Sequence, residues 1–514
     1  MLTTSPGLHQ AAATYQFTSF SQFVFHRSNR LYLYTAAVVL TISWLVFKSF
    51  YPHPNIIFDS YYYIIGAVNH ARVGPWPIGY SWFLRLVHVC SSSAYAVLVV
   101  QYLIINLALL YFFFTLRYWF GFHKITSIVL FLFLLLNPIF LFMSNLILSD
   151  ILFTTLSLLW FTQLIWLIFR PAPYMLFTHA LLLLAVFTVR YNALYYPVVG
   201  TLAFLLSRQK KGIVIAGIAL QLVVLGSFIA YTTHAMQKDY GVASFSPFGS
   251  WKMASNALYI YENVYRNDSS AVPPRFQALD NRVRAYFNGP HYKVDVLTND
   301  ATWGSFYMWM QPSPLIQHMF SIYGKDRMNL NFVKFAPISP LYGDYGTYII
   351  KKHPGAFLRY FIVPNIMRYM NPPQEVLVDA YNPFSLQRDT IGGPAIRWYQ
   401  LTTLRVHHSL INFRTQLFII YPALSTFVHY FFVLSCICFY CLKSFRRLSP
   451  ALFYSLLAVT VLWLADFAFN ITASSPVLRY QLFIMTIEIA FALVFTQYIL
   501  ESTAAKETGA SSVK

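Results

Sequence analysis

Residues 51–86 read YPHPNIIFDSYYYIIGAVNHARVGPWPIGYSWFLRL and separate the first long apolar run of the chain from the second. The stretch is rich in tyrosine and proline and contains one carboxylate, Asp59. This pattern predicts a loop, or a pair of short surface helices, immediately outside a membrane. A lone carboxylate among aromatic side chains, at the mouth of an apolar helix bundle, makes Asp59 the first candidate for a functional residue.

The composition indicates an integral membrane protein. The chain has 514 residues, of which 57% are hydrophobic and only 10% are charged, whereas a soluble domain carries about 25% charged residues. The aromatic content of 19% fits residues that favour the boundary between lipid and water. The net charge of +19 is explained by Lys and Arg retained in cytoplasmic connections and attracted to membrane lipids, so we expect no nucleic-acid partner.

The cysteines and the N-terminus add two further expectations. The four cysteines form neither a disulfide framework nor a cysteine-based zinc pattern. Residues 1–30 have no apolar core of their own, so we expect the first apolar run to be an uncleaved anchor.

The expected fold is an all-α polytopic membrane protein with about ten transmembrane helices and a large extracytoplasmic domain of mixed or mainly helical structure. The predicted organisation is a cytoplasmic segment 1–30, a transmembrane module 31–234 with a first outer loop at 51–92, an extracytoplasmic domain 235–413, C-terminal transmembrane helices within 414–500 and a cytoplasmic tail 501–514. The predicted spans are 31–50, 93–116, 125–147, 149–169, 174–190, 192–207, 212–234, 414–441, 449–470 and 476–500, each close to the ~20 residues that cross the hydrocarbon core.

The distribution of Lys and Arg predicts the orientation. With the N-terminus inside, the basic connections fall on one side, which favours cytoplasmic termini and places Asp59 and the segment 235–413 outside. These connections contain Arg117, Lys124, Arg170, Arg208, Lys210, Lys211, Lys443, Arg446 and Arg447. Within the outer segment, residues 353–370 have the spacing of an amphipathic helix lying on the membrane surface.

Few charged residues remain near the outer ends of the spans. They are Asp59, Asp150, Arg190, Asp466 and Arg479. Ionisable groups at membrane boundaries are costly and are usually paired or functional. Chemistry on a phosphate leaving group needs cations, and transfer to a hydroxyl needs a carboxylate or a metal.

Each candidate also has a structural interpretation. Asp59 could cap a helix over 60–71, and Asp150 could be a first-turn acid. Either arginine could reach the interface without another role. Ser475 and Pro476 predict a helix start just before Arg479. For Asp466 we favour a structural pairing with a neighbouring arginine.

Three outer histidines, His53, His70 and His234, could join an acid around a divalent ion. None of them shows metal-ligand spacing, and a hydrogen-bonded boundary histidine is the alternative. The metal and the cofactor therefore stay unknown at this stage, with a divalent cation or no cofactor both open.

The layout resembles the GT-C glycosyltransferase superfamily, and more narrowly the bacterial families related to protein O-mannosyltransferases and lipid A aminoarabinose transferases. The resemblance covers residues 31–234 and, more weakly, the final spans. It is carried by FDSYYYIIGAV, GPWPIGY, SDILF, RYNALYYP and VLRYQL.

This resemblance implies a polyisoprenyl-phosphate sugar donor, an envelope acceptor that is a lipid, glycan or protein, and inversion at the anomeric carbon in a bacterial inner (plasma) membrane. Asp59 and Asp150 would be catalytic, with Asp59 as general base or metal ligand. Arg190 and Arg479 would bind the lipid phosphate. The implied substrate pocket contains Tyr62, His70, Tyr80 and Tyr480. Many relatives carry two adjacent acids where this chain has Asp59 and Ser60, which favours the single-acid mechanism.

Two other classes of function stay open. A transporter or flippase of a lipid-linked solute predicts charged residues near the membrane midplane and repeat symmetry. A structural subunit predicts that Asp59→Ala is harmless.

Overall fold

The computed structural model describes residues 19–266, 268, 272–289, 306–325, 332–374, 397–400 and 417–511. Within these ranges the chain is helical, and its one strand-like feature is an isolated bridge between Asn55 and Leu146. Eight helices are long and apolar enough to cross a membrane, which confirms a polytopic helical membrane protein. They are α3 (Arg27–Phe50), α6 (Ala94–Phe120), α7 (Lys124–Leu136) continued by α8 (Pro138–Ser144), α9 (Ser149–Phe169), α12 (Lys211–Tyr240), α24 (Tyr421–Cys441), α25 (Pro450–Ala473) and α26 (Leu482–Ser511).

The two other predicted spans are shorter helices. The span 174–190 corresponds to α10 (Met175–Val189), and the span 192–207 to the 3₁₀ helix η2 (Tyr191–Tyr195) followed by α11 (Tyr196–Leu206). At 1.5 Å per residue, the 15 residues of α10 and the 11 of α11 are shorter than the ~30 Å hydrocarbon core. Both pack against α9 and α12 inside the bundle.

One end of the bundle gathers the helix ends that carry the basic connections. The Tyr498 hydroxyl donates to the Phe120 carbonyl at 3.0 Å, and the backbone N–H of His123 donates to Gln497 Oε1 at 3.1 Å. Ser444 and Ser502 are hydrogen-bonded at 2.9 Å. The turns next to Arg117, Lys124 and Lys443 therefore share one end of the bundle.

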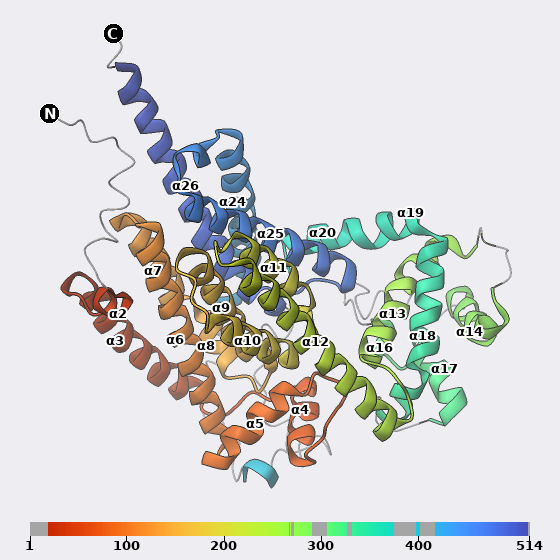
Figure 1. Ribbon diagram of the computed structural model, residues 1–514. Helices are drawn as coiled ribbons and strands as arrows, with labels where there is room; N and C mark the ends of the chain where they lie inside the picture. Colours follow the sequence, from red (N-terminus) through yellow and green to blue (C-terminus); the bar gives the residue numbers. More distant parts are fainter. Residues whose placement is uncertain are drawn as a thin grey trace.

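The opening stretch forms two short helices, α4 (Phe58–Val68) and α5 (Gly79–Cys90), as predicted for residues 51–86. Both lie at one edge of the bundle, below α10 and beside the end of α12 in Figure 1. Helix α5 buries Leu84 and Val87 and exposes the apolar side chains of Leu86 and Val89. Such a helix suits a position in the membrane interface.

A second hydrophobic core lies to one side of the bundle, at the right in Figure 1. Trp251 and Phe335 stack at its centre with ring centroids 4.3 Å apart. The buried Asp280 carboxylate accepts hydrogen bonds from the hydroxyls of Tyr261 and Tyr345 at 2.7 and 2.8 Å. We call this body the second core; its helices are α13 (Pro247–Val264), α14 (Gln277–Asn288), α16 (Phe306–Trp309), α17 (Pro314–Tyr323) and α18 (Phe332–Lys352).

The chain returns from the second core to the bundle through α19 (Pro354–Phe357), a π-helical turn η4 (Leu358–Ile362) and α20 (Val363–Met370). The helix predicted over 353–370 is therefore present. Its apolar side chains Val363 and Met367 are exposed, whereas Phe361 and Tyr369 are buried. Parts of the predicted 235–413 domain, including 375–396 and 401–416, lie outside the described residues.

Candidate functional site

The loop before α4, which the sequence predicts to be the first outer loop, is fixed against the turn between α8 and α9. The backbone N–H of Asn55 donates to the carbonyl of Asn145 at 2.8 Å, and that of Ile147 donates to the carbonyl of Asn55 at 3.2 Å. The Asn145 amide donates to the His53 carbonyl at 3.1 Å and accepts from Lys48 Nζ at 2.7 Å. These contacts hold the start of α4 beside the start of α9.

Asp59 and Asp150 occupy equivalent positions, because each is the second residue of its helix. Asp150 is the first-turn acid that its sequence context predicted. Asp59 is not the N-cap, since α4 begins at Phe58 and Ile57 is the cap. The Tyr63 hydroxyl and Ser149 Oγ lie 2.9 Å apart and join the two helices near both carboxylates.

The two arginines reach the same place from two turns. Arg190 follows α10 and precedes η2. Arg479 lies in the 3₁₀ helix η8 (Leu478–Tyr480) between α25 and α26. The predicted helix start at Pro476 is wrong, because α26 begins at Leu482. Ser475 instead accepts a hydrogen bond from Arg368 Nη1 at 3.0 Å.

The four ionisable side chains form one group, which we call the Asp–Arg cluster: Asp59, Asp150, Arg190 and Arg479. Arg190 Nη1 pairs with Asp150 Oδ1. Both terminal nitrogens of Arg479 lie 3.2 Å from Asp59 Oδ2, and its Nη1 lies 3.8 Å from Asp150 Oδ2. Two carboxylates and two guanidinium groups from widely separated stretches therefore meet at the end of the bundle opposite the basic connections.

Tyr480 joins the cluster through its ring. The guanidinium carbon of Arg190 lies 4.2 Å from the ring centroid, and that of Arg479 lies 4.7 Å from it. The Tyr480 hydroxyl also accepts from Arg479 Nη2 at 2.9 Å. An aromatic face restrains a guanidinium while leaving its N–H groups available to an anion.

The two carboxylates differ in accessibility. The Asp150 side chain is 1% exposed, whereas that of Asp59 is 27% exposed. Asp59 Oδ1 receives no hydrogen bond from the residues that the structure describes. Asp59 can therefore accept a proton from a ligand, while Asp150 is committed to Arg190.

A cavity of about 360 Å³ lies between the outer loop and the second core. Its wall includes Tyr62, Tyr63, Trp76, Tyr240 and Phe332. Burial raises the pKa of the Tyr62 and Tyr63 phenols, so both stay neutral. The indole N–H of Trp76 has no hydrogen-bond partner within the described part of the chain. Such a wall suits a ligand with apolar faces and hydrogen-bonding edges.

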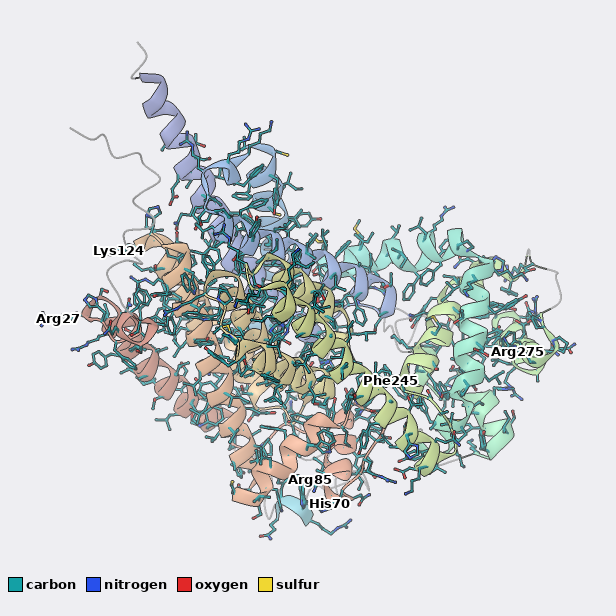
Figure 2. All side chains as sticks on the ribbon, in the orientation of Figure 1. Arg27, His70, Arg85, Lys124, Phe245 and Arg275 are labelled. Atoms are coloured by element: carbon teal, nitrogen blue, oxygen red, sulfur yellow. The ribbon has the colours of Figure 1, made fainter. Side chains whose placement is uncertain are left out.

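Two residues of the predicted pocket lie away from the Asp–Arg cluster. His70 is exposed beyond the far end of α4, about 15 Å along the helix from Asp59. Figure 2 shows His70 at the edge of the molecule near Arg85, far from Lys124. Tyr80 is fully buried, and its hydroxyl donates to Gln101 Oε1 at 2.6 Å. Neither belongs to the Asp–Arg cluster.

Within the described ranges, Asp466 has no arginine partner of the kind expected. Its carboxylate instead accepts hydrogen bonds from the hydroxyls of Tyr195 at 2.6 Å and Tyr369 at 2.8 Å. The sequence reading also missed a fully buried pair, His429 and Glu488, whose Nδ1 and Oε1 atoms lie 2.9 Å apart. The lone acid within the apolar run MTIEIAFALV was the signal for this pair.

The described His, Cys, Asp and Glu side chains do not form a metal-binding group. Among the described residues, no three His, Cys, Asp or Glu side chains gather in a way that could hold a metal ion. The Arg479 guanidinium lies between the carboxylates of Asp59 and Asp150, at 3.2 and 3.8 Å.

Comparisons with other proteins returned no match, whether against protein-family models, curated proteins or solved structures. The functional argument therefore depends on the geometry of the Asp–Arg cluster and on the cavity that α4 lines.

Proposed function

We propose that the chain is a GT-C-type glycosyltransferase that moves a sugar from a polyisoprenyl-phosphate donor to an acceptor hydroxyl at the outer face of the membrane. One observation supports this most strongly: Asp59, Asp150, Arg190 and Arg479 converge at one end of an apolar helix bundle. A lipid-borne anion meets cations at such a boundary without leaving the membrane.

In the proposed reaction the acceptor oxygen attacks the anomeric carbon and forms the new glycosidic bond. The bond between that carbon and the phosphate oxygen breaks, and its electron pair leaves with the polyisoprenyl phosphate. The proton of the acceptor hydroxyl passes to the carboxylate of Asp59, acting as general base. Arg479 and Arg190 stabilise the charge on the departing phosphate, where each charge-assisted hydrogen bond contributes about 1.5–3 kcal/mol.

The two carboxylates have different proposed roles. Asp59 is more exposed and is held by the longer contacts of 3.2 Å to Arg479. A donor phosphate can compete for Arg479 and leave Asp59 to the acceptor. Asp150 is almost fully buried against Arg190 and keeps that guanidinium in place.

The cavity beside α4 is the proposed acceptor site. Tyr63 lines this cavity and also contacts Ser149, the residue before Asp150. Tyr62 supplies part of the aromatic wall and Tyr480 restrains both arginines. The acceptor is proposed as an envelope lipid, glycan or protein.

The proposed topology has ten crossings, with α10 and α11 as two short ones, and both termini in the cytoplasm of a bacterium. The Asp–Arg cluster and the second core then face outward, and the exposed apolar sides of α5 and α20 lie against the membrane. If neither α10 nor α11 crosses the membrane, this orientation is unchanged, because two consecutive crossings return the chain to the same side.

The test is to offer the purified protein radiolabelled polyprenyl-phosphate sugars together with an extract of envelope acceptors. We expect free polyprenyl phosphate to appear with a labelled acceptor. Recovery of intact donor alone, across a panel of hexosyl and pentosyl donors, would contradict the proposal.

A second candidate function is transport or flipping of a lipid-linked solute. The buried pair of His429 and Glu488 within α24 and α26 favours it, because ionisable pairs deep among spanning helices often serve transport. Counterflow of intact labelled lipid in vesicles, without release of polyprenyl phosphate, would favour this candidate.

A further inference from the structure

The turn that carries Arg479 is held by a segment that comes from the second core. The backbone N–H of Leu478 donates to the carbonyl of Pro373 at 2.9 Å. Gln481 Nε2 donates to the carbonyl of Tyr369 at 3.1 Å. Leu478 and Gln481 flank Arg479, so both sides of its short 3₁₀ turn are attached to residues 369–373.

Two more contacts join the same segments. Asn365 Nδ2 donates to the carbonyl of Ile471 at 3.2 Å, near the end of α25. Arg368 Nη1 donates to Ser475 Oγ at 3.0 Å. Helix α20 and the residues after it therefore follow the whole connection from α25 to α26.

Gln481 is itself fixed from its other side. Its Oε1 lies 3.2 Å from His429 Nε2, and His429 Nδ1 lies 2.9 Å from Glu488 Oε1. Gln481, His429 and Glu488 are all fully buried. Because the Gln481 side chain has a partner at both its Nε2 and its Oε1, its buried amide is held in one orientation.

The same segment reaches the turn of the second arginine. The Tyr369 hydroxyl donates to Asp466 Oδ2, and the Tyr195 hydroxyl donates to Asp466 Oδ1. Tyr195 belongs to η2, which begins directly after Arg190. Tyr369 is therefore connected to both arginine-bearing turns.

We propose that Gln481 and Tyr369 are positioning residues, through which α20 holds Arg479 where the phosphate of the lipid donor binds. This inference rests on the proposed function. A cation improves phosphate binding and transfer only when it is held close to the productive geometry, and a three-residue 3₁₀ helix cannot supply that rigidity alone. The second core thus supports the cation site in addition to bordering the cavity.

The experiment measures the dissociation constant of polyisoprenyl phosphate for the full-length protein in lipid nanodiscs. The variants are Gln481→Met, Arg479→Ala and the double variant. The matched control is Gln497→Met, which removes a second buried, hydrogen-bonded glutamine; Gln497 lies in α26, at the opposite end of the bundle. Thermal unfolding of each variant is recorded alongside.

We expect Gln481→Met to weaken binding about tenfold and Gln497→Met to leave it within about twofold. In the Arg479→Ala background, Gln481→Met should add almost nothing, because a residue acting through Arg479 loses its effect when Arg479 is removed. An equal loss in both backgrounds, or no loss in the native background, would overturn the positioning role while leaving the proposed function intact.

A second variant tests the proposal if Gln481→Met does not fold. Ser475→Ala removes one hydroxyl that accepts from Arg368, and we expect it to weaken phosphate binding about threefold. Unchanged binding in that variant would overturn the proposal. If the native protein does not bind polyisoprenyl phosphate at all, the proposed function fails, and the positioning role fails with it.

Discussion

Asp59 and Asp150 hold the same position in their helices, yet their surroundings differ. Asp150 is 1% exposed and pairs with Arg190, while Asp59 is 27% exposed and shares Arg479. A buried charge that loses its partner is strongly destabilised, whereas a partly exposed pair contributes little. The same residue type in equivalent places therefore has two different energetic consequences.

This difference predicts the stability of two variants. Asp150→Ala leaves Arg190 without its carboxylate in a site where the arginine is 14% exposed, so we expect a loss of up to about 3–5 kcal/mol. Asp59→Ala should cost less, about 1 kcal/mol, because Asp59 is 27% exposed and Arg479, which is 10% exposed, keeps Asp150 Oδ2 at 3.8 Å. Thermal unfolding in detergent compares the two, and an equal fall in midpoint would contradict the assignment.

At the residue scale, the sequence indicates which ionisable groups are unusual but not how they pair. Asp59 and Arg479 are 420 positions apart, so no local pattern can join them. Asp466 was expected to meet an arginine because of its charge, and two tyrosine hydroxyls satisfy it instead. His70 and Tyr80 shared the decisive stretch with Asp59, but helix geometry carries them to other surroundings.

Among the elements, the existence of α4 and α5 can be predicted from local sequence signals. Their position against the other helices depends on packing. Gly79 starts α5, and a Cβ built there would lie 2.6 Å from the backbone carbonyl carbon of Thr188. Only glycine allows α5 to approach the end of α10 this closely. Thr188 lies two residues before Arg190, so this contact also helps to position Arg190 in the Asp–Arg cluster.

We therefore expect Gly79→Ala to lower the thermal unfolding midpoint, since the backbone of Thr188 cannot give way without moving α5 or α10. The control is Gly226→Ala in α12, where an added Cβ meets open space. That change should be neutral or stabilise the protein by up to about 1 kcal/mol. A Gly79→Ala variant as stable as Gly226→Ala would show that α5 and α10 are not in tight contact.

The errors at this scale have a physical cause. Ser475 and Pro476 have the signature of a helix start, but contacts from residues 365–373 hold this connection, and no α-helix begins before Leu482. The span predicted over 192–207 is not such an error: the structure has a short apolar helix there, preceded by a 3₁₀ turn, and its crossing stays a prediction. Local propensity is overridden wherever a distant segment satisfies the backbone.

For the whole molecule, composition was sufficient to predict a polytopic helical membrane protein. It did not reveal that α12 contributes to both hydrophobic cores, through Phe228 at one level and Met236 two turns later. Nor did it reveal that α20 returns to the bundle and supports the turn of Arg479. These features depend on long-range packing, which leaves no periodic signal in the chain.

The proposed orientation makes a prediction about the native cysteines. Cys90 is exposed at the end of α5, and Cys441 is exposed at the opposite end of the bundle, where α24 ends. In variants that keep one cysteine each, a membrane-impermeant maleimide should label Cys90 in intact cells and Cys441 only after permeabilisation. The reverse pattern would place the Asp–Arg cluster in the cytoplasm.

The central claim is most directly tested by replacing Asp59 with its amide and measuring release of polyisoprenyl phosphate from the labelled donor. We expect Asp59→Asn to lower the rate at least ~100-fold, as loss of a general base does, while the protein still folds and inserts. The control Asp239→Asn, whose carboxylate is also 27% exposed and paired with an arginine, should keep the native rate. Native activity in Asp59→Asn would contradict the account.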